Sequence, residues 1–291
     1  MPEAYEVDVE EVEYLRHADR PLLARVYRPR GKGPFPAVIE AHGGAWVQGN
    51  RANNEAINMP VAKGGVVVVA VDFRCPPEGT YPASVADINF AVRWLKSNAE
   101  RFGTRPEMVG TMGTSSGGHL AVLVAMKPDD PRYAAIPIKG PRQFGARVPY
   151  VVALWPVICP FGRWKNHAAR ESRGEPDNAR PSPGHIQQQY WVTEEAMAEG
   201  SPNLALERGD KVELPDILYL QNPLDTLHPR ENLDSFISAY RKAGGQVQLE
   251  FFEGKAYDLV RTDPGSASAR AAIAKMVDFI HRHAAGPAQS R

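Results

Sequence analysis

Six residues, Gly-Thr-Ser-Ser-Gly-Gly at positions 113–118, place a serine among glycines in the pattern G-x-S-x-G. The pattern directly follows an apolar run at residues 108–112, which predicts a strand, and directly precedes residues 119–126, which predict a helix. A serine on so sharp a turn needs a glycine two residues to either side, because a side chain there would collide with the neighbouring backbone. This order of elements predicts that Ser115 is a nucleophile for acyl transfer, rather than that the glycines merely shape a turn.

A second glycine segment, His-Gly-Gly-Ala-Trp at residues 42–46, follows the predicted third strand. Successive glycine peptides there can direct two backbone N–H groups at one oxygen. We expect the amides of Gly43 and Gly44, together with the amide of Ser116, to form an oxyanion hole with three donors. His42 is expected to hold the glycine segment through hydrogen bonds, because a catalytic base would have to reach the hydroxyl of Ser115.

These motifs, followed by Asn-Pro-Leu-Asp at residues 222–225, resemble the hormone-sensitive-lipase-like esterases of the α/β-hydrolase superfamily. The resemblance implies a carboxylesterase, which hydrolyses carboxylic esters through an acyl-enzyme and uses no cofactor or metal. It also implies that Asp225 is the acid of a catalytic triad, in the chain order of the fold. The alternative is that Asp225 caps the helix predicted to begin near Pro229. Asp72 and Asp216 are poorer candidates, because neither lies in the loop after the seventh strand.

The resemblance fails at the third member of the triad. The family places a histidine three residues after the glycine that follows the last strand, and here that glycine is Gly254 and the third residue is Tyr257. A phenol cannot accept and then donate a proton near neutral pH as imidazole does, so a triad with Tyr257 should lose several powers of ten in rate. Three explanations stay open: a change introduced to trap a ligand, a natural change toward a binding protein, and a wrong alignment of this loop.

The other histidines are weaker candidates for the base. His228 lies three residues after Asp225 and would reach Ser115 only if that loop were rebuilt. His167 and His185 could approach only if the segment that contains them folds over the serine. The remaining ones are expected to point into packing or to lie too far along the last helix: His119, His281 and His283. The predicted function is thus a carboxylesterase impaired at position 257, and the alternative is a non-hydrolytic small-molecule binding protein on the same scaffold.

The elements that must position these residues alternate between apolar runs and helical patterns. Residues 5–15 and 22–27 predict an antiparallel hairpin. Short apolar runs then predict strands buried on both faces, at residues 37–39, 66–71, 108–112, 150–154, 217–220 and 247–252. Between the runs, apolar residues recur at helical spacing, as at Leu233, Phe236, Ile237 and Tyr240. We therefore expect an α/β fold with a mostly parallel sheet of about eight strands and helices on both faces.

Residues 156–206 break this alternation. They are rich in Pro, Gly, Arg and aromatic residues and show little periodicity beyond a helix near residues 186–197. A loop this long inside a compact domain is usually functional, so we expect a cap inserted into a single domain of residues 1–291. Aromatic residues in and before the cap favour a pocket for an aryl or short acyl ester. They are Trp46, Trp155, Phe161 and Trp164.

Composition narrows the class of protein further. Hydrophobic residues make up 43% of the chain and charged residues 23%, and 34 Lys and Arg balance 34 Asp and Glu, which argues against a nucleic-acid partner. No apolar run approaches the roughly 20 residues needed to span a bilayer, and the acidic start of the chain differs from a secretory signal. Cys75 and Cys159 have no metal or redox spacing. We expect a cytoplasmic enzyme with a small-molecule ester as its partner and no membrane association, and a homodimer is left open.

Overall fold

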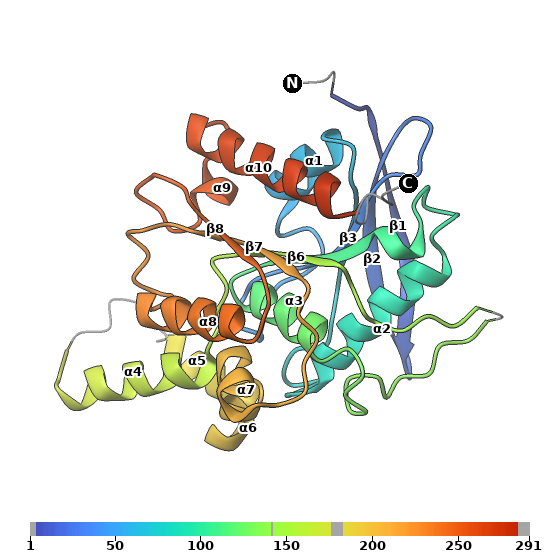
Figure 1. The fold of residues 1–291 in the computed structure, drawn as a ribbon. Coiled ribbons are helices and arrows are strands. Elements are labelled where there is room, and N and C mark those ends of the chain that lie inside the picture. The colour runs from blue at the N-terminus through green and yellow to red at the C-terminus, as the bar shows by residue number, and fades with distance from the viewer. Residues whose placement is uncertain (1–3, 141, 176–182, 285–291) are drawn as a thin grey trace.

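One mixed sheet of eight strands runs through the described part of the chain, residues 4–140, 142–175 and 183–284, in the computed structural model (Figure 1). Its order is β1-β2-β4-β3-β5-β6-β7-β8. The β1–β2 and β2–β4 pairs are antiparallel and all other pairs are parallel. The strands are β1 Val7–His17, β2 Arg20–Pro29, β3 Ala37–Ala41, β4 Val67–Val71, β5 Val109–Thr114, β6 Tyr150–Leu154, β7 Asp216–Gln221 and β8 Val247–Phe251. The predicted hairpin and the predicted α/β sheet are confirmed.

The apolar runs form central strands because helices cover both faces of the sheet. Every residue of β3, β4 and β6 is buried. One face is covered by α1 (Glu55–Lys63) and α10 (Ala267–Ala284), and the other by α2 (Ala83–Ser97), α3 (Ser116–Met126) and α8 (Arg230–Lys242) (Figure 1). Two short helices, η1 (Pro106–Met108) and α9 (Leu259–Thr262), precede β5 and follow β8. Each face of the sheet has its own hydrophobic core.

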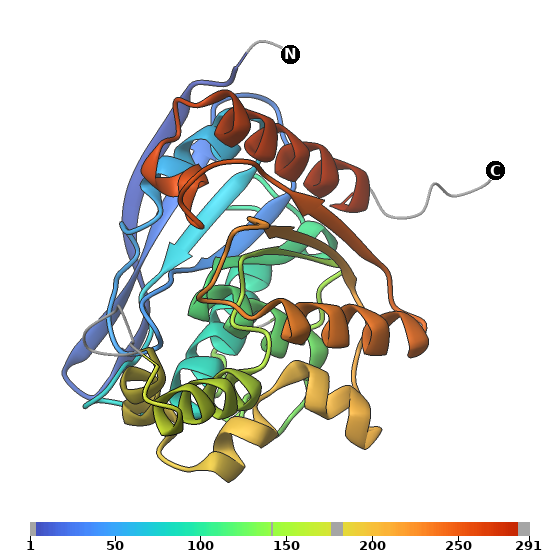
Figure 2. The same cartoon turned by 90° about the vertical axis from the view of Figure 1, so that its left-hand side faces the viewer.

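Between β6 and β7 the chain forms four short helices, where the sequence predicts little periodicity (Figure 2). They are α4 Pro160–Ser172, α5 Pro183–Trp191, α6 Glu194–Glu199 and α7 Pro202–Arg208. We call residues 156–208 the inserted segment, of which residues 176–182 lie outside the described part. The sequence pattern missed α4 because the only side chains it buries are Pro160 and Arg163, so apolar residues do not repeat at helical spacing.

The inserted segment packs at the end of the sheet where Ser115 lies. The buried rings of Tyr190 and Trp191 lie 5.9 and 5.3 Å from the ring of Trp46, which follows β3. His119, one helical turn after Ser115, has its Nε2 atom 2.7 Å from a carbonyl oxygen of the segment. These contacts join α5 and the end of α6 to the elements that carry the predicted site.

Two expectations from composition can be compared with the structure. Cys75 and Cys159 are both free and buried, and burial raises the pKa of the Cys75 thiol to about 12. These are the properties of unreactive thiols. Among the described helices, none has both the length and the apolar character needed to cross a membrane.

Candidate active site

Ser115 stands on the turn between β5 and α3, with backbone angles φ 52° and ψ −120°. A positive φ is strained for a residue that carries a side chain, and such strain is typical of functional turns. The flanking glycines are required, because a Cβ at Gly113 would lie 2.4 Å from the carbonyl oxygen of Gly117, and a Cβ at Gly117 would lie 2.1 Å from that of Ala41. The Ser115 amide donates to the Leu154 carbonyl oxygen at 2.9 Å and ties the turn to β6. The strand, turn and helix thus follow one another in the predicted order.

The glycine segment after β3 lies directly against this serine. A Cβ at Gly43 would be 3.4 Å from the Cβ of Ser115. Gly44 has φ 123°, and a Cβ there would lie 1.9 Å from the Gln48 carbonyl oxygen, so the position requires glycine. The Gly43 amide donates to the Thr114 hydroxyl oxygen at 3.1 Å. The Gly43 N–H, expected to donate to the oxyanion, thus has the Thr114 hydroxyl as its acceptor in this structure, and its role in an oxyanion hole stays a prediction.

His228 stands between Ser115 and Asp225. Its Nε2 atom lies 3.2 Å from the Ser115 Oγ atom, and its Nδ1 atom lies 2.7 Å from Oδ2 of Asp225. The His228 and Asp225 side chains are buried, with 4% and 0% of their surface exposed. An imidazole that contacts a hydroxyl through one nitrogen and a carboxylate through the other has the arrangement of a serine-hydrolase triad. His228, which the sequence analysis places among the weaker candidates, therefore has the geometry expected of a catalytic base.

Tyr257 does not stand in the place of that histidine. Its ring packs beside His228, with ring centres 5.5 Å apart, and edge-on to Trp155 at 6.4 Å. Burial raises the pKa of the phenol further above its ordinary value. The expectation that Asp225 orients the side chain at position 257 is wrong, because the imidazole of His228 occupies the space between the carboxylate and Ser115.

A tight turn after β7 directs His228 back toward the serine. The backbone N–H groups of Leu227 and His228 donate to Oδ1 of Asp225 at 2.8 and 3.1 Å, a turn that an aspartate side chain stabilises. Gln221 donates from Nε2 to Oδ2 of Asp225 at 3.1 Å and to the His228 carbonyl oxygen at 3.3 Å. Asp225 does not cap α8, whose N-cap residue is Pro229. One carboxylate oxygen thus holds the backbone of the turn, and the other holds the imidazole ring.

The other predicted histidines and acids have partners away from Ser115. His42 is buried with its Nδ1 atom 2.7 Å from the Gly43 carbonyl oxygen, so it contacts the glycine segment as expected. His119 is buried as well, and its Nδ1 atom accepts the indole N–H of Trp46 at 3.2 Å. Burial lowers the pKa of both imidazoles to about 4. The remaining contacts are His167 with His185, His281 with Gly64, His283 with Asp216, and Asp72 with Arg51.

A buried carboxyl group lies behind the glycine segment. Glu40 in β3 is 1% exposed and accepts hydrogen bonds from the amides of Asn54 at 2.7 Å and Asn58 at 3.2 Å. Burial raises the pKa of Glu40 to about 7. Asn54 also donates to Oγ1 of Thr114 at 2.9 Å, and this hydroxyl oxygen accepts the Gly43 amide. The chain of contacts connects Glu40 to the loop beside Ser115.

Replacing Glu40 by glutamine should raise the free energy of unfolding by about 2 kcal/mol more at pH 8 than at pH 5. The carboxyl group ionises near 4.5 in the unfolded chain and near 7 in the folded one, so its ionisation favours the unfolded chain increasingly as the pH rises from about 4.5 to 7. Glutamine keeps an oxygen for Asn54 and cannot ionise. Urea unfolding of both proteins at the two pH values measures the difference.

The matched control for this experiment is Glu107→Gln, which changes an exposed carboxylate in η1. It should shift stability equally, by little, at both pH values. A Glu40→Gln variant whose gain is the same at pH 5 and pH 8 would show that the carboxyl group ionises similarly in the folded and unfolded chains.

The aromatic residues predicted to line a pocket differ in burial. Trp46 and Trp155 are each 1% exposed and belong to the two hydrophobic cores. Phe161 and Trp164, both on α4, are half-buried. A role for these four in substrate binding stays a prediction. Sequence reasoning missed Arg163, also on α4, which lines a small cavity together with His228. A single arginine in a polar segment carries no pattern that could have identified it.

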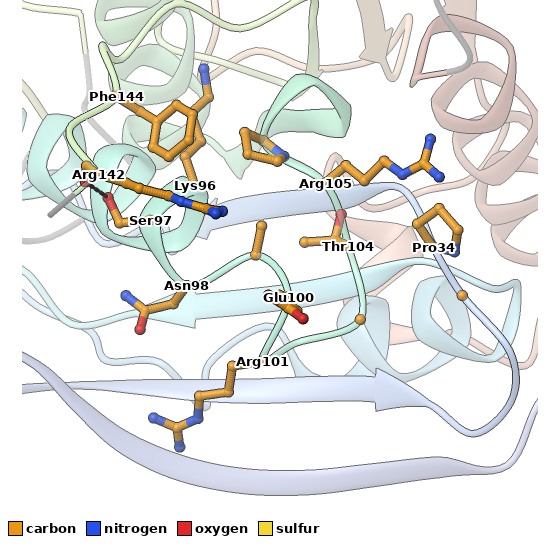
Figure 3. Close-up of a pocket in the computed structure, with 14 residues that line it drawn as sticks. Pro34, Lys96, Ser97, Asn98, Glu100, Arg101, Thr104, Arg105, Arg142 and Phe144 are labelled. Atoms are coloured by element: carbon orange, nitrogen blue, oxygen red, sulfur yellow. Dashed lines mark hydrogen bonds between the residues drawn. The ribbon is translucent and has the colours of Figure 1, made fainter.

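A surface hollow at the other end of the sheet is separate from the group formed by Ser115, His228 and Asp225 (Figure 3). Residues Pro34 and Thr104 in its wall precede β3 and β5, whereas Ser115 follows β5. Lys96, Arg101 and Arg105 surround the hollow in Figure 3. It therefore lies at the amino ends of the parallel strands, away from the serine and its histidine.

Two named esterases are similar to this chain in sequence. Esterase LipC of Mycobacterium tuberculosis is 28% identical over 261 residues, which are 86% of this chain and 59% of LipC. The versiconal hemiacetal acetate esterase of Dothistroma septosporum is 35% identical over 105 residues, which are 35% of this chain and 32% of that protein. The chain thus spans less than two thirds of the length of either relative.

Solved structures extend the likeness to the fold. An esterase from Pyrobaculum calidifontis superposes with a TM-score of 0.75 at 24% identity and covers 94% of this chain and 85% of its own. A bacterial heroin esterase superposes with a TM-score of 0.74 at 21% identity, covering 95% and 84%. At these identities the likeness establishes the fold, and it confirms the α/β-hydrolase fold that the sequence resemblance implies.

The sequence model of the BD-FAE family matches residues 25–190, which are more than half of the chain. This range contains the glycine segment and the turn that carries Ser115, and it ends before Asp225 and His228. The matched range, the order of the motifs and the fold agree, and the chain belongs to the BD-FAE family.

Proposed function

We propose that this protein hydrolyses carboxylic esters of small molecules through an acyl-enzyme on Ser115. The observation that carries the proposal is the contact sequence from the Ser115 hydroxyl through His228 to Asp225, at 3.2 and 2.7 Å. The strained backbone of Ser115 and the glycine segment beside it support the same chemistry. Relatives that are named esterases add to this support.

In the proposed reaction, His228 takes the proton of Ser115 Oγ through Nε2 while the oxygen attacks the ester carbonyl carbon. Asp225 holds the imidazole by its Nδ1 side and stabilises the imidazolium. The amides of Gly44 and Ser116 donate to the oxyanion of the tetrahedral intermediate. The imidazolium then protonates the leaving alcohol, and a water molecule repeats the sequence on the acyl-enzyme to release the acid.

Assigning the base to His228 also changes the interpretation of Tyr257. A chain that lacked its base would be an impaired esterase or a binding protein. With His228 as the base, neither follows, and Tyr257 serves as a packing partner of the imidazole ring. The inserted segment acts as the cap of the proposed site, because α4 carries Arg163 to the cavity that His228 also lines.

Two measurements test this proposal together. The protein should hydrolyse p-nitrophenyl acetate, and a fluorophosphonate probe should label Ser115, as identified by mass spectrometry of the modified peptide. Ser115→Ala should remove the label. Ser172→Ala, which changes an exposed serine at the end of α4, should retain it. A label on another serine, or neither turnover nor label, would contradict the proposal.

A further inference from the structure

Arg163 is a buried cation without a complete set of partners. Its side chain comes from the first turns of α4 and is 7% exposed. Nε donates to Oε1 of Gln187 at 2.8 Å, whereas the buried Nη2 atom has no hydrogen-bond partner among the described residues. Burial lowers the pKa of the guanidinium to about 10, so the group is still charged at neutral pH. A charge withdrawn from water normally requires an opposite charge or full hydrogen bonding.

The guanidinium lies next to the reactive centre. Arg163 and His228 line one small cavity together with Val157, whose N–H donates to the Ser115 carbonyl oxygen at 3.1 Å. On its other side, the guanidinium carbon lies 5.2 Å from the ring centre of Trp46, which follows the glycine segment. The Arg163 side chain thus lies close both to His228, the proposed base, and to Trp46, which follows the glycine segment.

The nearby carboxylate of Asp225 does not supply the hydrogen-bond acceptor that Nη2 of Arg163 lacks. Its two oxygens already accept hydrogen bonds from His228, Gln221 and the backbone of the turn. The contact with Gln187 orients Arg163, and Gln187 is itself fixed through Nε2 to the Pro160 carbonyl oxygen at 3.0 Å. The arrangement is a positioned cation with an unused donor, which is what an arginine site for a planar carboxylate requires.

We infer that Arg163 binds a carboxylate carried by the ester substrate, so that the preferred substrates are anionic esters with a second, free carboxylate. The inference rests on the proposed function, since the ester bond is placed at Ser115. The carboxylate can belong to the acyl part or to the alcohol part, and both would present the same group to the guanidinium. The free carboxylate supplies the charge and the acceptor that Nη2 lacks.

The experiment compares pairs of esters of equal shape and different charge. For the acyl side the pair is mono-p-nitrophenyl glutarate and p-nitrophenyl 5-methylhexanoate. For the alcohol side it is 4-acetoxybenzoate and 4-isopropylphenyl acetate. We expect Arg163→Met to lower the ratio of kcat/KM values, anionic over neutral, by about 30- to 100-fold in one of the pairs, chiefly through KM. The pair whose ratio falls shows whether the free carboxylate belongs to the acyl part or to the alcohol part of the ester.

Two variants serve as comparisons for Arg163→Met. Lys165→Met removes an exposed cation two residues away on the same helix and should leave both ratios within about twofold, because exposed charges are screened. Arg163→Lys should restore part of the preference, since lysine keeps the charge and loses the planar fork. Ratios that are equal in the unaltered protein, or that Arg163→Met leaves unchanged, would overturn the inference.

A binding measurement separates this inference from the proposed function. Monomethyl glutarate and 4-acetoxybenzoate are titrated into Ser115→Ala by calorimetry, and binding of at least one of them should be lost in the double variant with Arg163→Met. Binding without any hydrolysis by the unaltered protein would support the carboxylate site and contradict the esterase proposal. Hydrolysis of neutral esters without any anion binding would support the esterase proposal and contradict the carboxylate site.

Discussion

We expect His228→Gln to lower kcat for p-nitrophenyl acetate by about 10⁴, because loss of the base in a serine hydrolase commonly costs this much or more. His228 is the imidazole that contacts both the Ser115 hydroxyl and the Asp225 carboxylate. Glutamine has a similar reach but cannot take up the serine proton. Initial rates under saturating ester, with protein unfolding followed in parallel to verify the fold, measure the effect.

Two substitutions at position 257 test whether the base is His228 or the residue at position 257. Tyr257→Phe should change kcat by less than about threefold, because the ring that packs on His228 and Trp155 is retained. Tyr257→His tests the sequence-based alternative, in which a histidine at this position restores a missing base and raises turnover by at least about 10³. With His228 in place it should bring no gain. A large gain from Tyr257→His together with an active His228→Gln variant would assign the base to position 257.

The elements that carry the site could be predicted from sequence because each has a strong local pattern. The strand before Ser115, the glycines around it and the helix after it are consecutive, so the turn is fixed by steric requirements within a few residues. The buried strands are also local signals, since a short, wholly apolar run rich in valine, such as that of β4, is typical of a strand covered on both faces. These predictions therefore depend only on residues that are close together in the sequence.

The base could not be predicted in the same way, because its position depends on side chains that hold a turn. Transferring the family spacing from Gly254 to Tyr257 assumes that the loop after β8 carries the base, whereas His228, the proposed base, lies in the loop after β7. The signal that was present is the spacing Asp225-x-x-His228, followed by Pro229. An aspartate that accepts the N–H groups two and three residues later reverses the chain, and it thereby brings the third residue back toward itself.

The Asp225→Asn variant should lower kcat by about 10³ to 10⁴ while leaving the fold intact. The two oxygens of Asp225 have separate tasks, since Oδ1 accepts two backbone N–H groups and Oδ2 accepts the imidazole. Asparagine can keep its oxygen on the backbone, and its amide then faces Nδ1 as a donor. The imidazole must carry its proton on Nε2 in that case, and it cannot accept the Ser115 proton.

Asp72→Asn is the matched control, because Asp72 directly follows β4, pairs with Arg51 and is the other acid near the carboxyl ends of the strands. Its kcat should stay within about threefold of the unaltered protein.

The decisive comparison is the double variant of Asp225→Asn with His228→Gln. If the aspartate acts only through the imidazole, its replacement should cost almost nothing further once His228 is absent, because residues that act as one unit lose their function together. Independent losses would instead multiply to about 10⁷ or more. Rates of the two single variants and the double variant, measured on p-nitrophenyl acetate, separate these cases. A multiplicative loss would mean that Asp225 supports catalysis through the backbone of the turn rather than through the imidazole of His228.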